Sequence, residues 1–305
     1  MSQTEPSNAG RPARLTVGVV GAGRVGAVLG AALDRIGHRV VAVSAVSGRS
    51  RARAALLVPA AHVVSPPEVL GAADLVLLTV PDDVLPGLVA GLVATGSIRP
   101  GQFLVHTSGR YGVGVLEPAT REAALPLALH PAMTFTGTAA DLPRLAGAAF
   151  GVTAPEALRH AAEALVLEIG AEPVWVPEEL RPLWHAALAH GANHLVTLVV
   201  QSMDLLRAAG VADPARVLGP LLSAALDNAL RTGDDALTGP VARGDAGTVA
   251  AHVQALGRVD PEALRTYRAL ARATADRALA SGRLQAADAE ALLDALAGPS
   301  NEAHA

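Results

Sequence analysis

The chain has 305 residues and a formal net charge of −4 at neutral pH. This length allows two domains with a large core, and the lack of a basic excess argues against nucleic acid as a main partner. The chain contains neither cysteine nor lysine, which excludes disulfides, thiolate catalysis, cysteine-based metal sites and Schiff-base chemistry. It is 51 % hydrophobic but only 2 % aromatic, so we expect an aliphatic core.

Residues 1–13 are polar and contain proline and glycine, without a signal-peptide pattern, and no apolar run reaches transmembrane length. We therefore expect a cytoplasmic protein that makes no membrane contact. We expect residues 1–13 and 298–305 to be tails.

Residues 15–26 predict a short apolar strand, a glycine-rich turn and the start of a helix. Gly21 permits the tight turn, Gly23 lets the backbone approach a pyrophosphate, and Gly26 lets the helix pack close to the strand. The helix directs its N-terminal amides and positive dipole end at the phosphates. The pattern predicts dinucleotide binding, the alternative being an ordinary strand–turn–helix connection. The expected cofactor-binding residues here are Gly21, Gly23, Arg24, Val25 and Gly26.

The second strand, residues 39–44, ends at Ser44 without the acidic residue that usually binds the ribose hydroxyl of NAD. Residues 47–53 then hold three arginines and two serines. Arginine suits a 2′-phosphate, so the segment predicts NADP(H), with Ser44, Arg49 and Arg51 as cofactor-binding residues. The alternative is a solvated basic turn.

Strands and helices continue to alternate as far as Pro177, with a helix expected from Pro81 to about Ala94 and another between Pro155 and Gly170. Beyond Pro177 the periodicity is helical only, and the pairs Asp213-Pro214 and Asp260-Pro261 predict helix starts with proline at the first position. The pattern predicts an α/β fold: a Rossmann doubly wound, mostly parallel sheet in residues 14–177, with a second all-α domain in residues 178–297. The further strands are expected at residues 62–64, 74–80, 103–106, 127–130, 149–153 and 172–176.

Ligands of open α/β sheets bind beyond the carboxyl ends of the strands. The strand ends therefore supply cofactor-binding candidates, namely Val80, Pro81 and His106, and two further candidates, Ser108 and Gly109, whose hydroxyl and amide suit a carbonyl or carboxylate oxygen. A serine hydrolase is excluded because no nucleophile elbow surrounds Ser108. His130 ends the next strand, and each strand-end histidine has either a direct role or an ordinary capping role.

The helical region holds three further groups of candidate residues. His185 and Asn193 are eight residues apart, which would place them ~12 Å apart along an α-helix and on one side of it. His190 and His194 have the spacing of a metal-binding pair, but no third ligand is evident, so we expect no metal. Thr238 precedes Gly239-Pro240, and Arg243 follows it by three residues. We expect a helix start here that could hold an anion. The alternative is a capped helix with a surface arginine.

Four segments resemble a known group of enzymes: His106–Gly109, His130-Pro131, His185–Asn193 and Leu237–Asp245. The chain resembles the 6-phosphogluconate dehydrogenase-like dehydrogenases and reductases, which include ketopantoate reductase, the β-hydroxyacid dehydrogenases and pyrroline-5-carboxylate reductase. It is more closely similar to the bacterial proteins that join a Rossmann-like domain to an uncharacterised helical domain (DUF2520). Some of these resemble the alternative ketopantoate reductases of pantothenate biosynthesis.

The resemblance implies an NADPH-dependent reductase of a small 2-oxo acid, with ketopantoate (2-dehydropantoate) as the leading substrate. Standard members use a lysine as proton donor, followed by an asparagine on the same helix face. This chain has no lysine, so His185 is the natural replacement, since histidine titrates near working pH. The catalytic candidates are His185, Asn193, Ser108 and His130, and the substrate-binding candidates are Ser108, Gly109, Asn193, Thr238 and Arg243.

The sequence also allows other interpretations. The proton donor could be His106, His130 or an ordered water, and the reaction could be imine reduction or β-hydroxyacid oxidation. The missing lysine also favours a non-catalytic NADP-binding regulatory protein. The alanine- and leucine-rich helical domain predicts a homodimer formed through that domain.

Overall fold

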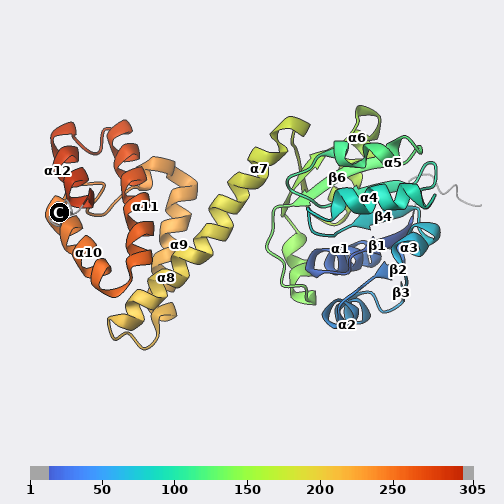
Figure 1. Ribbon diagram of the computed structural model, residues 1–305, viewed down its shortest axis with the longest axis horizontal. Helices are drawn as coiled ribbons and strands as arrows, with labels where there is room; N and C mark the ends of the chain where they lie inside the picture. Colours follow the sequence, from blue (N-terminus) through green and yellow to red (C-terminus); the bar gives the residue numbers. More distant parts are fainter. Residues whose placement is uncertain (1–13, 298–305) are drawn as a thin grey trace, which may run out of the picture. The chain divides into compact units, whose positions relative to one another are not determined.

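The computed structural model describes residues 14–297 of the protein (Figure 1). The chain divides into two compact units between Gly191 and Ala192. The tails expected at residues 1–13 and 298–305 lie outside the described residues. Every helix within the described part is too short or too polar to span a bilayer.

The first unit is built on one eight-stranded sheet with the strand order β3-β2-β1-β4-β5-β6-β7-β8. All neighbouring strands are parallel except β6 and β7, which run antiparallel. This confirms the predicted mostly parallel, doubly wound sheet. The strands are β1 (Thr16–Val20), β2 (Arg39–Ser44), β3 (His62–Val63), β4 (Leu75–Leu78), β5 (Phe103–His106), β6 (Leu125–Pro131), β7 (Ala149–Thr153) and β8 (Glu172–Trp175).

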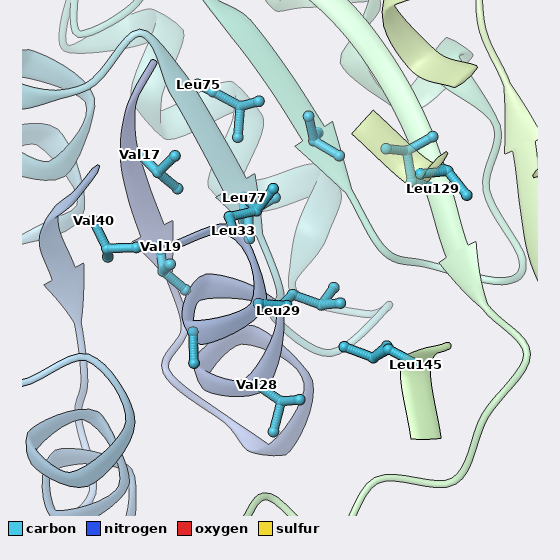
Figure 2. Packing of buried hydrophobic residues seen from close by; sticks show 14 of the residues in the cluster. Val17, Val19, Val28, Leu29, Leu33, Val40, Leu75, Leu77, Leu129 and Leu145 are labelled. Atoms are coloured by element: carbon cyan, nitrogen blue, oxygen red, sulfur yellow. The ribbon is translucent and has the colours of Figure 1, made fainter. Parts of the chain in front are cut away.

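Alternate residues of the central strands face opposite sides of the sheet, as their period-2 geometry requires. Figure 2 shows one side, where Val17, Val19, Leu75 and Leu77 pack with helix residues such as Leu29. The intervening strand residues belong to the core on the other face. Both faces are covered, which explains the nearly continuous apolar run of β4.

Helices cover both faces of this sheet. Buried residues of α1 (Arg24–Arg35), α2 (Gly48–Leu57) and α6 (Arg159–Glu168) belong to the core of Figure 2. Those of α3 (Pro66–Ala72), α4 (Leu85–Ala94) and α5 (Glu117–Thr120) belong to the opposite core. The predicted start of α4 at Pro81 is wrong, because Pro81–Val84 form a turn and the helix begins at Leu85.

The second unit is helical. It contains α8 (His194–Ala208), α9 (Pro214–Thr232), α10 (Ala246–Val259), α11 (Pro261–Ala280) and α12 (Ala286–Ala297). The predicted starts at Asp213-Pro214 and Asp260-Pro261 are confirmed: each aspartate caps its helix by accepting backbone N–H groups, and each proline takes a first-turn position. The small core is formed mainly by valines of α10 and by alanines and leucines of α11 and α12.

The helix predicted to begin at Gly239-Pro240 is not formed there. Residues 240–244 make turns, Gly244 has a φ of 73°, and α10 begins only at Ala246, with Asp245 as its cap. A residue at positive φ cannot continue a right-handed helix, so the start lies beyond it.

The segment that links the units is helical but not uniformly α-helical. α7 (Arg181–Leu188) is followed by a π-helical turn, Ala189–Asn193, and then by α8. The α-helical spacing expected between His185 and Asn193 therefore does not hold. We expected the domain boundary at Pro177, whereas α7 belongs to the first unit. Hydrogen bonds of Arg181 and Trp184 to the sheet edge account for this placement.

Candidate active site

The glycine turn after β1 has the geometry that a dinucleotide requires. Gly21 has a φ of 94°, and a Cβ there would lie 2.9 Å from the Thr79 carbonyl oxygen. A Cβ on Gly26 would overlap Thr79 Oγ1, so only glycine lets α1 pack so closely to the sheet. A Cβ on Gly23 would instead meet only the Gly21 oxygen, at 3.8 Å, so this position opens outward. A pyrophosphate can therefore approach the backbone of the turn at Gly23, the glycine that must face it.

The N-terminus of α1 is arranged to receive an anion. Its first residue, Arg24, follows Gly23, which provides no capping side chain, and the first turn contains no acidic residue. Backbone amides at a helix N-terminus, including those of Arg24 and Val25, point outward and carry the positive end of the helix dipole. The residues present therefore fit a dinucleotide phosphate.

The end of β2 supports the turn and carries a basic surface. Ser44 Oγ accepts the Gly21 N–H at 3.1 Å, so this hydroxyl is used inside the turn. Ser47 caps α2, whose first turn also lacks an acidic residue. Arg49 and Arg51 are exposed beside it, and Arg51 Nε donates to the Ala45 carbonyl oxygen at 3.2 Å. The absence of a carboxylate and the presence of arginines fit a 2′-phosphate better than a free hydroxyl.

A third arginine of the same segment was not selected from the sequence. Arg53 Nε donates to the carbonyl oxygen of Gly137 at 3.1 Å. Gly137 lies so close to Arg24 that a Cβ there would be 3.1 Å from the Arg24 Cα. Buried Asp141 accepts the Gly137 N–H at 2.7 Å and holds this loop after β6 in place. The loop thus brings a third cation next to the glycine turn.

Val80 and Pro81 follow β4 beside the same turn. A Cβ on Gly21 would lie 3.2 Å from Val80 Cγ1, and Thr79 Oγ1 donates to the Gly21 carbonyl oxygen at 2.6 Å. Both predicted positions therefore lie at the β1–β4 edge, where the strand order reverses and ligands of such sheets bind.

His106 organises the loop that follows β5. Its side chain is fully buried, its Nδ1 accepts the Ser108 N–H at 3.2 Å, and its Nε2 lies 2.8 Å from the Gly112 carbonyl oxygen. Because Nδ1 accepts, the ring proton is on Nε2 and is donated to Gly112. Burial lowers the His106 pKa to about 4, so the ring is neutral. Both ring nitrogens of His106 are thus engaged in hydrogen bonds within the loop.

Ser108 has two roles in this loop. Its hydroxyl oxygen accepts the N–H groups of Arg110 and Tyr111, at 3.2 and 3.1 Å, and its carbonyl oxygen accepts a hydrogen bond from Arg181 at 2.5 Å. The hydroxyl proton is not used by these bonds. Ser108 can therefore still donate to a ligand, as predicted for a substrate-binding residue.

Glu178 and Arg181, before and at the start of α7, hold the loop that follows β5 by hydrogen bonds. Arg181 is fully buried and donates also to the carbonyl oxygens of Tyr111 and Gly151, each at 2.9 Å. The Glu178 carboxylate accepts the N–H groups of Val113 and Gly114, at 2.8 and 2.9 Å. Burial lowers the Arg181 pKa to about 10, which leaves it charged at neutral pH. Sequence reasoning missed Arg181, although it lies one helical turn before His185 and so shares its face.

Two histidines meet at Gly109. A Cβ on Gly109 would lie 2.8 Å from His130 Nε2 and 2.7 Å from His185 Cδ2, and the two imidazole rings are 5.6 Å apart between centroids. Burial, with the nearby charge of Arg181, lowers the His130 pKa to about 3. The structure thus brings together Ser108, Gly109, His130 and His185 from the predicted set, at the carboxyl ends of β5 and β6.

The other predicted residues belong to the second unit. Asn193 is the last residue of the π-helical turn and is exposed. Thr238 and Arg243 are also exposed, on the turns before α10. Within residues 14–297, no group of three or more metal-binding side chains is arranged around a common point.

Two family models match the chain. Residues 1–131 match the Rossmann-like domain, and residues 148–274 match the domain of unknown function DUF2520. These two matches confirm the predicted similarity to proteins that join a Rossmann-like domain to a DUF2520 domain. No curated protein matches the sequence.

Solved structures resemble this chain over most of its length. A Bacteroides fragilis protein provisionally named an NADP oxidoreductase is 22 % identical, with a TM-score of 0.72 over 86 % of this chain and 98 % of that one. Thermotoga maritima protein TM1727 is 19 % identical, with a TM-score of 0.63 over 87 % and 99 % of the two chains. A reductive aminase from Aspergillus terreus, solved with NADPH and ethyl levulinate, is 18 % identical, with a TM-score of 0.63 over 92 % and 99 %. The chain therefore shares the fold of these three proteins.

Proposed function

We propose that the protein is an NADPH-dependent reductase of a small 2-oxo acid, with ketopantoate as the first substrate to test. One observation carries the proposal: His130 and His185 border Gly109 at the carboxyl ends of β5 and β6, on the same sheet edge as the glycine turn. When bound, NADPH supplies the hydride, and the protein supplies position, charge and a proton.

NADP(H) would be held by the glycine turn, the N-terminus of α1 and the arginines of α2. We expect NADPH to bind at least about tenfold more tightly than NADH, because charge-assisted bonds to the 2′-phosphate contribute ~1.5–3 kcal/mol each. Replacing both Arg49 and Arg51 with alanine should remove most of this preference in a fluorescence titration. Arg35→Ala, at the far end of α1, is the matched control and should change neither affinity. Equal affinities in the unmodified protein would mean that the arginines form only a solvated turn.

His185 would take the place of the missing lysine as proton donor. It is partly exposed, lies on α7 and borders Gly109. His185→Ala should lower turnover by ~10²–10⁴, as expected for loss of a general acid, and leave NADPH affinity within about twofold. His185→Gln, which cannot release a proton, should be nearly as slow, and kcat in both variants should lose its basic limb. His160→Ala, an exposed histidine on α6, is the control.

A different outcome would assign the donor elsewhere. If His185→Ala keeps normal turnover and His130→Ala abolishes it, the proton comes from the strand side of the site. If both variants remain active, ordered water is the donor.

The substrate class follows from the charges near the site. Buried Arg181 is a permanent cation that lowers the pKa of both His106 and His130, so its field reaches this sheet edge. Such a field favours an anionic 2-oxo acid over a cationic iminium. Asn193, Thr238 and Arg243, which belong to the second unit, stay predictions as substrate-binding residues.

Imine reduction is the second candidate, favoured by the fold likeness to a reductive aminase. Assays of NADPH oxidation should compare ketopantoate and other 2-oxo acids with cyclic imines. Turnover of imines alone would reverse the assignment. NADPH binding without turnover of either class would instead support a non-catalytic regulatory protein.

We further propose that the protein is a homodimer formed through its helical unit. α8 has no buried residue although it is rich in apolar side chains, and Val196 on α8 and Leu221 on α9 are both 63 % exposed. An apolar groove of about 520 Å³, lined by residues of α8, α10 and α11, adds to this surface. Light scattering at micromolar concentration should give twice the monomer mass. Val196→Asp combined with Leu221→Asp should lower it, whereas Leu167→Asp on α6 should not.

A further inference from the structure

Trp184 lies against the edge of the sheet because β7 has a glycine at the contact. A Cβ on Gly151 would be 2.7 to 2.9 Å from three atoms of the indole ring. Gly151 is also the register partner of His130 in the antiparallel pair of β6 and β7. The indole is therefore placed beside the His130 ring, and any larger residue at position 151 would displace it.

The contact between these rings determines which nitrogen of His130 carries the proton. Trp184 Nε1 is 3.0 Å from His130 Nδ1, and an indole nitrogen can only donate a hydrogen bond. His130 Nδ1 must therefore accept, so the proton of the neutral ring is on Nε2. The groups facing His130 are Trp184, His185, His106 and Arg181, and the last three all oppose a second positive charge there.

His130 Nε2 points to the place where a ligand would be expected. It would be 2.8 Å from a Cβ on Gly109, and the His185 ring borders the same spot. No hydrogen bond of Nε2 to another group is found among the described residues, and it is not among their buried, unsatisfied atoms. Nε2 therefore has an N–H that can be donated to a ligand beyond the strand ends.

We propose that His130 donates this N–H to the carbonyl oxygen of the substrate and that Trp184 is a positioning residue that fixes the required tautomer. The inference rests on the reductase activity proposed above and gives the two histidines different tasks. As the hydride reaches the carbonyl carbon, the electron pair of the C=O bond moves to oxygen. The oxygen is hydrogen-bonded by His130 and takes one proton from His185, which solvent restores. A neutral donor suits this task because it keeps the same hydrogen bond throughout the working pH range.

The tautomer can be observed without any catalysis. In protein labelled with ¹⁵N-histidine, long-range proton–nitrogen spectra distinguish a protonated from an unprotonated ring nitrogen. The signals that are absent from the spectrum of His130→Gln should show the Nε2–H form. They should stay unchanged between pH 5 and pH 8, a range that begins about two units above the His130 pKa of about 3. A ring protonated on Nδ1, or one that titrates in this range, would overturn the inference.

Trp184→Phe removes the indole donor and keeps an aromatic ring. The His130 signals should then change to a mixture of tautomers, and kcat for ketopantoate should fall by about tenfold, the value of one hydrogen bond. NADPH affinity should stay within about twofold, and the basic limb of the kcat profile should keep its position because His185 is intact. Trp175→Phe is the matched control, since the Trp175 indole donates to Glu163 and should change neither readout.

The outcomes separate this inference from the proposed function. If Trp184→Phe behaves like Trp175→Phe in both readouts, Trp184 has no positioning role. If the tautomer changes as expected but the unmodified protein reduces no 2-oxo acid or imine, the reductase proposal fails and the role of His130 toward a substrate fails with it. The control of the tautomer by Trp184 would stand.

Discussion

The acid sensitivity of the first unit should report directly on the two strand-end histidines. His106 and His130 have pKa values of about 4 and about 3 in the folded protein, in both cases chiefly because of burial, whereas an unfolded histidine has a pKa of 6.5. Below pH 6.5 the unfolded chain binds protons that the folded chain does not, so stability falls as the pH falls. The stability that the two neutral histidines contribute is complete above about pH 7.5. As the pH falls, it declines until the pKa values of the folded protein are reached.

The size of the effect follows from these values. The contribution of each histidine to the free energy of unfolding falls by about 1.4 kcal/mol per pH unit below 6.5. At pH 5 the loss is therefore ~2 kcal/mol for each histidine and ~4 kcal/mol for the pair. That is a large part of the ~5–15 kcal/mol that stabilises an ordinary domain. The range from pH 7.5 to pH 5 lies above the titration of the carboxylates whose pKa values are lowered, such as Asp74 and Asp141, so they contribute little.

The measurement can be restricted to the first unit, since both tryptophans of the chain, Trp175 and Trp184, belong to it. Urea denaturation followed by tryptophan fluorescence should show the loss between pH 7.5 and pH 5. His130→Gln, whose side-chain oxygen can still accept the indole N–H, should lose only about half as much. His160→Gln should behave like the unmodified protein. A change of less than ~1 kcal/mol in the unmodified protein would refute the reasoning, because two buried neutral histidines cannot give so small a loss.

Three substitutions test the rest of the site. Gly23→Ala should leave the urea midpoint unchanged but weaken NADPH binding measured by titration, because its Cβ has room in the turn and would occupy the approach of the pyrophosphate. Gly26→Ala should also lower stability, by ~1–3 kcal/mol, because its Cβ overlaps Thr79 Oγ1; equal urea midpoints for the two variants would contradict this difference. Arg181→Met should cost about 3 kcal/mol or more in the same denaturation, since three carbonyl oxygens, two in buried and one in a part-buried hydrogen bond, lose their donor. An unchanged midpoint would show that water replaces the guanidinium without cost.

Some corrections to the sequence-based predictions have a common cause. The starts of α4 and α10 were expected at prolines, Pro81 and Pro240, because proline suits the first turn of a helix. Proline also suits a turn, and residues beyond it decide between the two. Gly244, at positive φ, delays α10 until Asp245 can cap it. The preference of proline for the first turn of a helix therefore could not by itself distinguish a helix start from a turn.

The features that the sequence alone determined depend on residues close together in the chain. The turn of Gly21, Gly23 and Gly26, the period-2 strands and the capped starts at Asp213 and Asp260 need only neighbours within a few positions. Backbone sterics and local hydrogen bonds control such features, so the alternation of strands and helices and the candidate dinucleotide turn were predictable.

Only the tertiary structure decided how the candidate site is assembled. Arg181 is buried because carbonyl oxygens 30 to 73 residues away in the chain converge on its guanidinium, and no local pattern distinguishes it from an exposed arginine. The tautomer of His130 depends on Trp184, 54 residues later, and on the missing side chain of Gly151. Burial and hydrogen-bond partners across such separations exist only once the sheet and α7 have packed together, because the desolvation that holds His130 neutral is a property of the folded surroundings.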